Sequence, residues 1–278
     1  MGEEAFAWAV VDTMSWPDFV RLKEFIYSEC GIKITDAKKT MLEARLHKRL
    51  RKLGIASFSL YCDYLFSNEG RRQELAEMID QVTTNKTDFF REPSHFAYLK
   101  EKALPDLLRS RRSVVVWSAG CSTGEEPYTL AMVLNESGCR FAILATDIST
   151  RVLEKAGSAV YDAESVADIP PALQKKYLLV SRDRERGLFR VVPELREKVT
   201  FRRLNLIDDD YGLGAPVDVI FCRNVLIYFD KQTQARLLQK LCRCLSPRGY
   251  VFLGHSETLF GVDVPLVRMA PTVYRKAP

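Results

Sequence analysis

Two glutamates follow directly on a glycine-containing turn in the stretch "VWSAGCSTGEEP", residues 116–127. An apolar run leads into this turn, and Glu125 and Glu126 stand where a helix is expected to begin. The bare backbone N–H groups of a helix N-terminus attract phosphate, which two carboxylates would repel. Gly120 and Gly124 let the backbone approach a ligand closely. The pattern therefore predicts a ligand that fits a glycine turn and negative charge together.

A further acid ends the next apolar run, "FAILATD", at Asp147. It lies about 20 residues beyond the turn, the distance at which an acid accepts hydrogen bonds from both hydroxyls of a ribose. S-adenosylmethionine has a ribose, a cationic sulfonium and no phosphate, so it fits the turn and the acids. NAD is the alternative ligand, although its pyrophosphate would face two carboxylates. The acids could also simply complement the positive end of the helix dipole.

The bulk composition limits the classes of protein that need to be considered. The chain has 278 residues with a net charge of +5, which suits one large domain or two ordinary ones. Its seven cysteines are scattered without a CxxC pair, and three histidines offer no metal-site spacing. The acidic first residues do not resemble a secretion signal, and no run is long enough for a membrane span. We therefore expect a cytoplasmic protein with reduced thiols, no metal and no membrane insertion.

Residues 1–82 are predicted to form an all-α domain. A run from Ser15 to Gly31 has a helix cap and a glycine stop, and further helical patterns cover 36–53, 57–67 and 71–82. One face of the 36–53 helix is basic, with Arg45, Lys48, Arg49 and Lys52 at helical spacing. Such a face is either merely solvated or steers an acidic partner.

Residues 97–278 read as an α/β domain of the Rossmann-like type. Five short apolar runs, "SVVVW", "FAILATD", "KVTFRRLN", "VDVIFC" and "GYVFLG", alternate with helical patterns, which predicts a parallel sheet covered on both faces. The stretch from about 174 to 198 breaks this rhythm and predicts a small β-subdomain inserted as a hairpin. Residues 83–96, "TTNKTDFFREPSHF", are either a plain linker or a segment that contributes to the active site.

Five segments together resemble one family: "TTNKTDFFRE", "WSAGCSTGEEPYTLAM", "ATDIS", "FCRNVLIYFD" and "GHSE". In order and through nearly the whole chain, they are similar to the CheR-type chemotaxis protein-glutamate O-methyltransferases. The resemblance implies methyl transfer from S-adenosylmethionine to glutamate side chains of bacterial chemoreceptors, with S-adenosylhomocysteine as the product. It also implies recruitment to chemoreceptor arrays, contact between the basic helix and acidic methylation helices, and, in some members, docking of a receptor C-terminal peptide on the β-subdomain.

The resemblance also carries functional residues onto this chain. The implied cofactor-binding residues are Asn85, Thr87, Arg91, Glu126, Asp147, Asn205, Leu206, Arg223 and Asn224. Arg91 and Tyr228 are the implied catalytic residues. Without the resemblance, Arg91 would be interpreted as a surface arginine and Tyr228 as a core aromatic residue.

The implied reaction needs no general base. A substrate glutamate with a pKa of about 4.3 is already ionised at neutral pH, and no His–acid pair is apparent in the sequence. We expect Arg91 to orient the carboxylate and Tyr228 to donate a hydrogen bond or cover the methyl group.

Two competing hypotheses remain: a methyltransferase for nucleic acid or small molecules, and a non-catalytic receptor-binding module on the same fold. The loop "RNVLIYF" lacks the Asn/Asp-Pro-Pro-aromatic motif of base amino-methylation. No interleaved basic and aromatic platform for nucleic acid is evident, so no nucleic-acid partner is expected.

Overall fold

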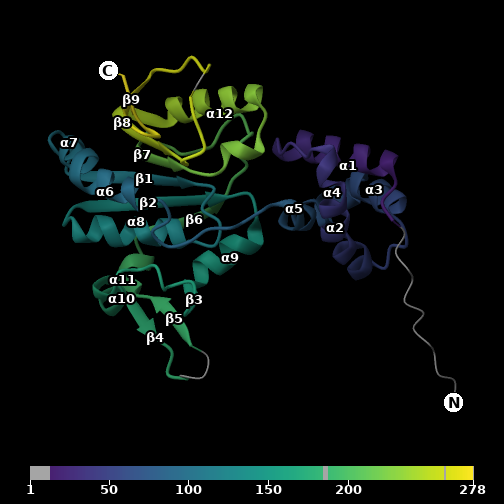
Figure 1. Cartoon of the computed structure of the whole chain (residues 1–278), viewed down its shortest axis with the longest axis horizontal. Helices are drawn as coiled ribbons and strands as arrows, with labels where there is room; N and C mark the ends of the chain where they lie inside the picture. Colours follow the sequence, from purple (N-terminus) through teal and green to yellow (C-terminus); the bar gives the residue numbers. More distant parts are fainter. Residues whose placement is uncertain (1–12, 184–186, 260, 278) are drawn as a thin grey trace. The chain divides into compact units, whose positions relative to one another are not determined.

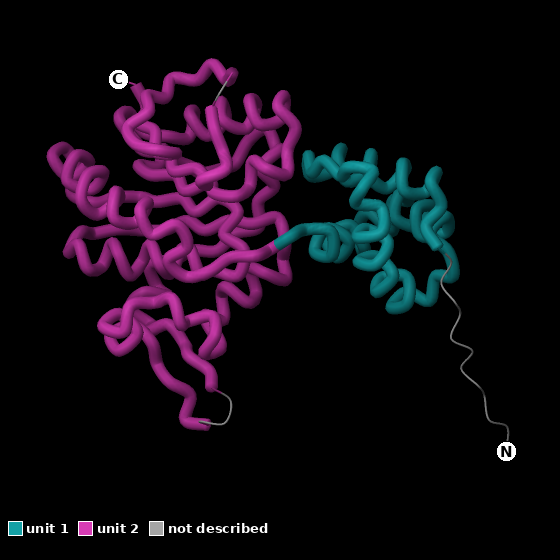
Figure 2. Tube along the Cα trace, in the orientation of Figure 1, with its two compact units in different colours: residues 1–84 teal, residues 85–278 magenta. Residues whose placement is uncertain are grey.

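The computed structural model describes residues 13–183, 187–259 and 261–277. The chain divides into two compact units, residues 1–84 and 85–278, which Figure 2 distinguishes by colour. The boundary lies directly before Asn85, the first residue of the predicted cofactor site.

All the regular elements among the described residues of the first unit are helices or helical turns. Its elements are α1 (Trp16–Cys30), the 3₁₀ turn η1 (Asp36–Lys38), α2 (Lys39–Leu53), α3 (Phe58–Phe66), α4 (Asn68–Gln73) and α5 (Leu75–Val82). Ser15 caps α1 by accepting a hydrogen bond from the Asp18 backbone N–H, and Gly31 ends the helix with a φ of 71°. The helix predicted over 71–82 is wrong in one respect, because α4 and α5 divide this region at Glu74.

The second unit is built on a seven-stranded sheet in the order β6-β2-β1-β7-β8-β10-β9. Its strands are β1 (Ser113–Ala119), β2 (Arg140–Asp147), β6 (Val199–Arg203), β7 (Val217–Cys222), β8 (Leu245–Leu253), β9 (Leu266–Ala270) and β10 (Val273–Lys276). The first five are mutually parallel and correspond to the five predicted apolar runs, which confirms the predicted parallel sheet. The antiparallel edge formed by β10 and β9 was not predicted.

The helices of the second unit lie along this sheet and in the connections between strands (Figure 1). They are α6 (Pro93–Tyr98), the π-turn η2 (Leu99–Ala103), α7 (Leu104–Leu108), α8 (Glu125–Glu136), α9 (Thr150–Ser158), α10 (Pro171–Tyr177), α11 (Pro193–Arg196), the 3₁₀ turn η4 (Leu226–Tyr228) and α12 (Lys231–Cys244). Figure 1 shows α8 and α12 on opposite sides of the central strands. No described helix is both long and apolar enough to cross a bilayer.

A second, three-stranded sheet forms the small β-subdomain. It contains β3 (Val160–Asp162), β5 (Leu188–Val191) and β4 (Leu178–Val180), all antiparallel in the order β3-β5-β4. The hairpin of β4 and β5 lies within the predicted 174–198 region. The sheet itself begins earlier, because β3 pairs with β5 from a position before that region. The sequence of β3, "VYD", is too short to show an alternating pattern.

Strand order places the candidate site at the carboxyl ends of β1 and β7. These strands are neighbours in the sheet, with Trp117 beside Ile220, although they are far apart in the sequence. The chain runs outward from β1 through β2 to β6 and then returns to β7, so the strand order reverses there. Open α/β sheets bind ligands at such a reversal. Below this edge, the fully buried Trp117 donates its Nε1–H to Thr146 Oγ1 at 2.9 Å.

Candidate active site

The glycine turn connects β1 to α8 in a conformation that residues with side chains rarely adopt. Gly120 has a φ of 84° and Gly124 a φ of 97°. A Cβ on Gly120 would lie 2.5 Å from the Val225 side chain, and one on Gly124 would lie 2.8 Å from the Tyr161 hydroxyl. The glycines therefore allow the turn to pack against the loop after β7 on one side and against β3 on the other.

Asp147 lies at the carboxyl end of β2, beside this turn. Its carboxylate accepts hydrogen bonds from the backbone N–H of Ser122 at 2.9 Å and of Ser149 at 3.0 Å. The residue is buried, with 8% exposure. A carboxylate accepts hydrogen bonds from hydroxyl groups as well as from N–H groups. The arrangement holds the acid in place and fits hydroxyl donors from a ribose.

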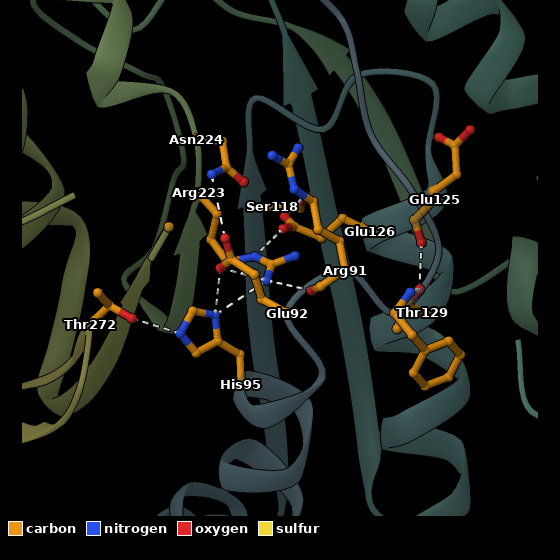
Figure 3. Close-up of polar contacts among 12 residues, drawn as sticks. Arg91, Glu92, His95, Ser118, Glu125, Glu126, Thr129, Arg223, Asn224 and Thr272 are labelled. Atoms are coloured by element: carbon orange, nitrogen blue, oxygen red, sulfur yellow. Dashed lines mark hydrogen bonds and ion pairs between the residues drawn. The ribbon is translucent and has the colours of Figure 1, made fainter. Parts of the chain in front are cut away.

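Glu125 and Glu126 leave the turn in different directions (Figure 3). Glu126 accepts hydrogen bonds from Ser118 Oγ at 2.6 Å and from Arg223 Nε at 2.7 Å, whereas Glu125 accepts one from Thr123 Oγ1 at 2.6 Å. Burial raises the pKa of Glu125, and the bond from Thr123 opposes that rise. The sequence argument from two adjacent acids is therefore wrong in one respect: the charge of Glu126 is already balanced by Arg223.

Arg223, directly after β7, is the centre of a buried network (Figure 3). Besides the bond to Glu126, its Nη1 donates to the Arg91 carbonyl at 2.8 Å and to Glu92 Oε2 at 3.3 Å. Its guanidinium lies over the ring of Phe96 at 5.2 Å. Because these contacts use most of its donors, Arg223 fixes the 83–96 segment onto the strand ends.

His95 completes the network from α6. Its Nδ1 lies 3.2 Å from Arg223 Nη1, and its Nε2 lies 2.8 Å from Thr272 Oγ1. Since a guanidinium can only donate, Nδ1 must accept and Nε2 must carry the proton. Burial and the neighbouring Arg223 lower the pKa of His95 to about 4. The sequence did not indicate a His–acid pair, yet His95 Nδ1 lies 3.4 Å from Glu92. With Nδ1 occupied and a low pKa, this histidine is unsuited to act as a general base.

Backbone strain gathers in this region. Among the residues that the structure describes, seven non-glycine residues have positive φ, and five of them lie here at 49° to 59°: Phe90, Glu92, Ser122, Asn224 and Thr272. Such conformations cost about 1–3 kcal/mol each and persist where the surroundings hold them, often at functional sites. Here the holding contacts include the bond from the Phe90 N–H to Thr129 Oγ1 at 3.1 Å.

The other residues expected from the 83–96 segment lie on its irregular first part. The Asn85 carbonyl accepts a bond from Ser122 Oγ at 2.8 Å, which ties the segment to the glycine turn. Thr87 and Arg91 are half-buried, and Arg91 Nη1 donates to the Lys86 carbonyl at 3.0 Å. The segment is therefore attached to the site along its length, and its last residues from Pro93 onward belong to α6.

The remaining expected residues follow β6 and β7 at the same edge. After β6, the Leu204 N–H donates to the Asp147 carbonyl at 2.9 Å, which brings Asn205 and Leu206 close to the end of β2. After β7, Asn224 Nδ2 lies 3.5 Å from Glu92 Oε1, and the half-buried Tyr228 ends the η4 turn. These contacts gather most of the expected residues of the second unit at one edge of the sheet, while Thr87 and Tyr228 lie on the segments connected to it.

Two acids in this region were not identified from the sequence as site residues. Glu92 contacts Arg223, Asn224 and the His255 N–H, and the buried Glu257 accepts backbone hydrogen bonds from the loop after β7. Glu257 belongs to "GHSE", which follows β8, and the carboxyl-end rule for parallel strands could have placed it beside Arg223. Glu92, His95 and His255 also have potential metal-ligating atoms within 4.8 Å of one another. Both ring nitrogens of His95 already have protein partners, namely Arg223 Nη1 and Thr272 Oγ1.

In the first unit, the predicted basic face of α2 is only partly exposed. Arg49 is buried and pairs with Glu74, and Arg45 donates to the Val82 and Thr83 carbonyls at 2.6 and 3.2 Å. The interpretation of Arg49 as part of a solvent-facing surface is therefore wrong. Lys48 and Lys52 are exposed, and the exposed Arg51 extends their face.

Family models match both units of the chain. The model described as "CheR methyltransferase, all-alpha domain" matches residues 17–83, and "CheR methyltransferase, SAM binding domain" matches residues 85–274.

Whole-chain relatives give the same result. The chain is 40% identical to "Chemotaxis protein methyltransferase" of Borreliella burgdorferi, with 92% of this chain and 93% of the relative covered. It is 40% identical to "Chemotaxis protein methyltransferase 2" of Pseudomonas aeruginosa, over 94% of this chain and 93% of the relative. It is also 40% identical to "Chemotaxis protein methyltransferase" of Escherichia coli, over 92% and 89%.

Proposed function

Because the chain belongs to the CheR methyltransferase family, we propose that it methylates glutamate side chains of chemoreceptors. The products would be glutamate methyl esters and S-adenosylhomocysteine, formed for sensory adaptation. One observation carries this proposal: relatives named chemotaxis protein methyltransferase match both units over 92% of the chain. S-adenosylmethionine is the cofactor of the domain that covers residues 85–274.

The residues at the strand ends fit this cofactor. Asp147 is a buried acid at the carboxyl end of β2, and the turn beside it carries no side chain at Gly120 and Gly124. The proposed binding set is Asn85, Thr87, Arg91, Glu126, Asp147, Asn205, Leu206, Arg223 and Asn224. Within this set, Arg223 donates from Nε to Glu126 and from Nη1 to the Arg91 carbonyl, so we assign it the support of Glu126 and Arg91.

For this reaction the protein has to bind S-adenosylmethionine and the substrate carboxylate and to orient them toward each other. When bound, S-adenosylmethionine supplies a methyl group on a positively charged sulfur, and the substrate carboxylate is already ionised. Arg91 would hold that carboxylate in a defined orientation, and Tyr228 would donate a hydrogen bond or shield the reacting groups from water. The low pKa of His95 agrees with a reaction that needs no general base.

Two surfaces are proposed for the receptor. Acidic methylation helices would meet the exposed cations of α2, namely Lys48, Arg51 and Lys52. A receptor C-terminal peptide would add to the β-subdomain, where the edge strand β4 exposes Leu179 by 49% and Val180 by 65%. The protein would work in the cytoplasm at chemoreceptor arrays, without inserting into the membrane.

The test is transfer of labelled methyl groups from S-adenosylmethionine to receptor-containing membranes. We expect base-labile label in the receptor band, released as methanol. Asp147→Ala is the cofactor-binding control and should weaken binding of S-adenosylhomocysteine by about 100-fold or more, since it removes a charged hydrogen-bond partner. Label recovered in RNA or in a small metabolite would contradict the proposed substrate, and cofactor binding without any transfer would support a non-catalytic receptor-binding module.

A further inference from the structure

Glu257 is a buried carboxylate that accepts hydrogen bonds from backbone N–H groups. Its Oε2 accepts from Gly254 at 2.6 Å and from Asn224 at 3.0 Å, and its Oε1 accepts from Leu226 at 2.7 Å. Its exposure is 5%. Burial raises its pKa, and the backbone bonds oppose that rise, including one from Ile227. A single side chain therefore satisfies several N–H groups that regular structure leaves without partners.

Two of the N–H groups that it binds, those of Asn224 and Leu226, belong to the loop that carries the proposed site residues. This loop follows β7 and contains Arg223, Asn224 and Tyr228. It departs from regular backbone at Asn224, whose φ is 59°. Part of the loop is held by the 3₁₀ turn η4, in which the Tyr228 N–H donates to the Val225 carbonyl at 3.2 Å. The N–H groups of Asn224 and Leu226 donate to Glu257 instead, so the backbone at these two positions depends on that carboxylate.

The loop is also enclosed from two sides. A Cβ on Gly254 would lie 2.8 Å from the Asn224 backbone N, and a Cβ on Gly120 would lie 2.5 Å from Val225 Cγ2. The loop thus passes between the residues after β8 and the glycine turn after β1. A shift of the loop would move Asn224 and Tyr228 and would disturb the turn that approaches the cofactor.

We propose that Glu257 is a positioning residue for methyl transfer, holding the 224–228 loop through its backbone so that Asn224 and Tyr228 reach the reacting groups. The inference rests on the proposed function for the roles of these two residues. Glu257 itself touches neither cofactor nor substrate in this account.

Glu257→Gln tests the proposal with almost no change in side-chain size. An amide has one acceptor oxygen, so its NH₂ group must face at least one backbone donor, and the loop must shift. We expect kcat to fall about 10- to 100-fold, as for a reacting group displaced by about 1 Å. KM for the receptor should be unchanged, and binding of S-adenosylhomocysteine should weaken by a smaller factor through Asn224.

Asp218→Asn is the matched control. Asp218 is a buried carboxylate of β7 that accepts from the Val115 backbone N–H at 2.9 Å and from Ser246 Oγ at 2.9 Å. It lies at the amino ends of the strands, away from the proposed site. Its substitution should lower the melting temperature without lowering kcat. Glu257→Asp, which keeps the charge but shortens the reach, provides the same test if Glu257→Gln does not fold.

The outcomes separate the inference from the proposed function. Parental kcat in both Glu257 variants, or equal losses of kcat in Asp218→Asn, would overturn the positioning role. The binding titration with S-adenosylhomocysteine needs no receptor. If the parent methylates no receptor, the proposed substrate is contradicted. Weaker binding of S-adenosylhomocysteine by Glu257→Gln than by Asp218→Asn would still support the role of Glu257 in positioning Asn224.

Discussion

Each unit contains a buried arginine that binds two glutamates, and the two sites differ in what they hold. Arg49 and Arg223 are each 6% exposed. Arg49 binds Glu74 through Nε and Nη2 at 2.8 and 2.6 Å and Glu77 through Nη1 at 2.6 Å. These partners lie at the start of α5, so this arginine connects regular helices α2 and α5.

Arg223, in contrast, connects segments of irregular backbone: the 83–96 segment and the loop after β7. Its partners are the side chains of Glu126 and Glu92, the carbonyl of Arg91 and the ring of His95. Glu92 has a φ of 57°, and the residue after Arg223 also has positive φ. The same ion-pair chemistry therefore stabilises a helix pair in one unit and a strained segment at the strand ends in the other. We infer that the first arginine serves stability and the second serves the site.

The largest expected effect is on catalysis, from Arg223→Met. The variant removes the donor that fixes the Arg91 carbonyl and leaves Glu126 without its cation. We expect methyl transfer to fall by about 100-fold or more, because the reacting groups lose their orientation. Single-turnover transfer to receptor membranes measures this, with Arg223→Lys as a control that keeps the charge but not the fork of donors. A parental rate in Arg223→Met would remove the distinction between the two arginines.

The next effect is on stability, from Arg49→Met. Removing one partner of a buried ion pair costs about 3–5 kcal/mol. Glu74 would keep only its hydrogen bond from the Tyr61 hydroxyl at 2.9 Å. Hydrogen exchange of peptides from residues 39–82 should report a lower free energy of local opening, while binding of S-adenosylhomocysteine stays parental. Loss of cofactor binding in this variant would show that Arg49 affects more than the stability of the first unit.

A pH dependence sharpens the difference, because only the Arg223 network contains a buried histidine. Burial and Arg223 lower the pKa of His95 to about 4, below its ordinary value of about 6.5. Between these values only the unfolded chain binds the proton, so the free energy of unfolding falls by about 1.4 kcal/mol for each pH unit of acidification. This stability is fully present above about pH 6.5 and is lost as the pH falls towards 4. Urea unfolding of the second unit at several pH values should show the slope in the parent and a smaller slope in His95→Gln; parallel curves would contradict the assignment.

The smallest expected effect concerns the exposed neighbours of Arg49. Replacing Lys48, Arg51 and Lys52 by glutamate should lower receptor methylation several-fold at low salt, because steering by exposed charges is long-range and screened. The difference from the parent should shrink at high salt, and cofactor binding should be unchanged. The matched variant with three glutamines should lie between the two. Equal rates for all three proteins at low salt would indicate that this face is merely solvated.

Features encoded locally were predictable from the sequence. The five parallel strands are short apolar runs, and α1 has its cap and its glycine stop within the chain itself. The strands β3, β9 and β10 were missed because they are short, and β9 is exposed along most of its length. The position of the site followed from the strand ends, which is a rule of parallel sheets rather than of single residues.

Features that depend on distant partners were not predictable. Nothing next to Arg49 shows that Glu74 will bury it, and nothing next to Glu126 shows that Arg223 will balance its charge. The roles of His95 and Glu257 arise only when the chain brings α6, β7 and β8 together. The pattern of residue types was therefore enough to predict which edge of the sheet carries the site. The ion pairs at that edge could be identified only from the three-dimensional structure.

The bond between His95 and Thr272 has a consequence for biosynthesis. The two residues are 177 positions apart, and Thr272, whose φ is 55°, directly precedes β10. During translation, the segment that carries Arg91 and His95 emerges early, long before its last contact exists. We therefore expect a nascent chain to acquire its parallel strands first and to become competent for chemistry only after residue 272 has left the ribosome.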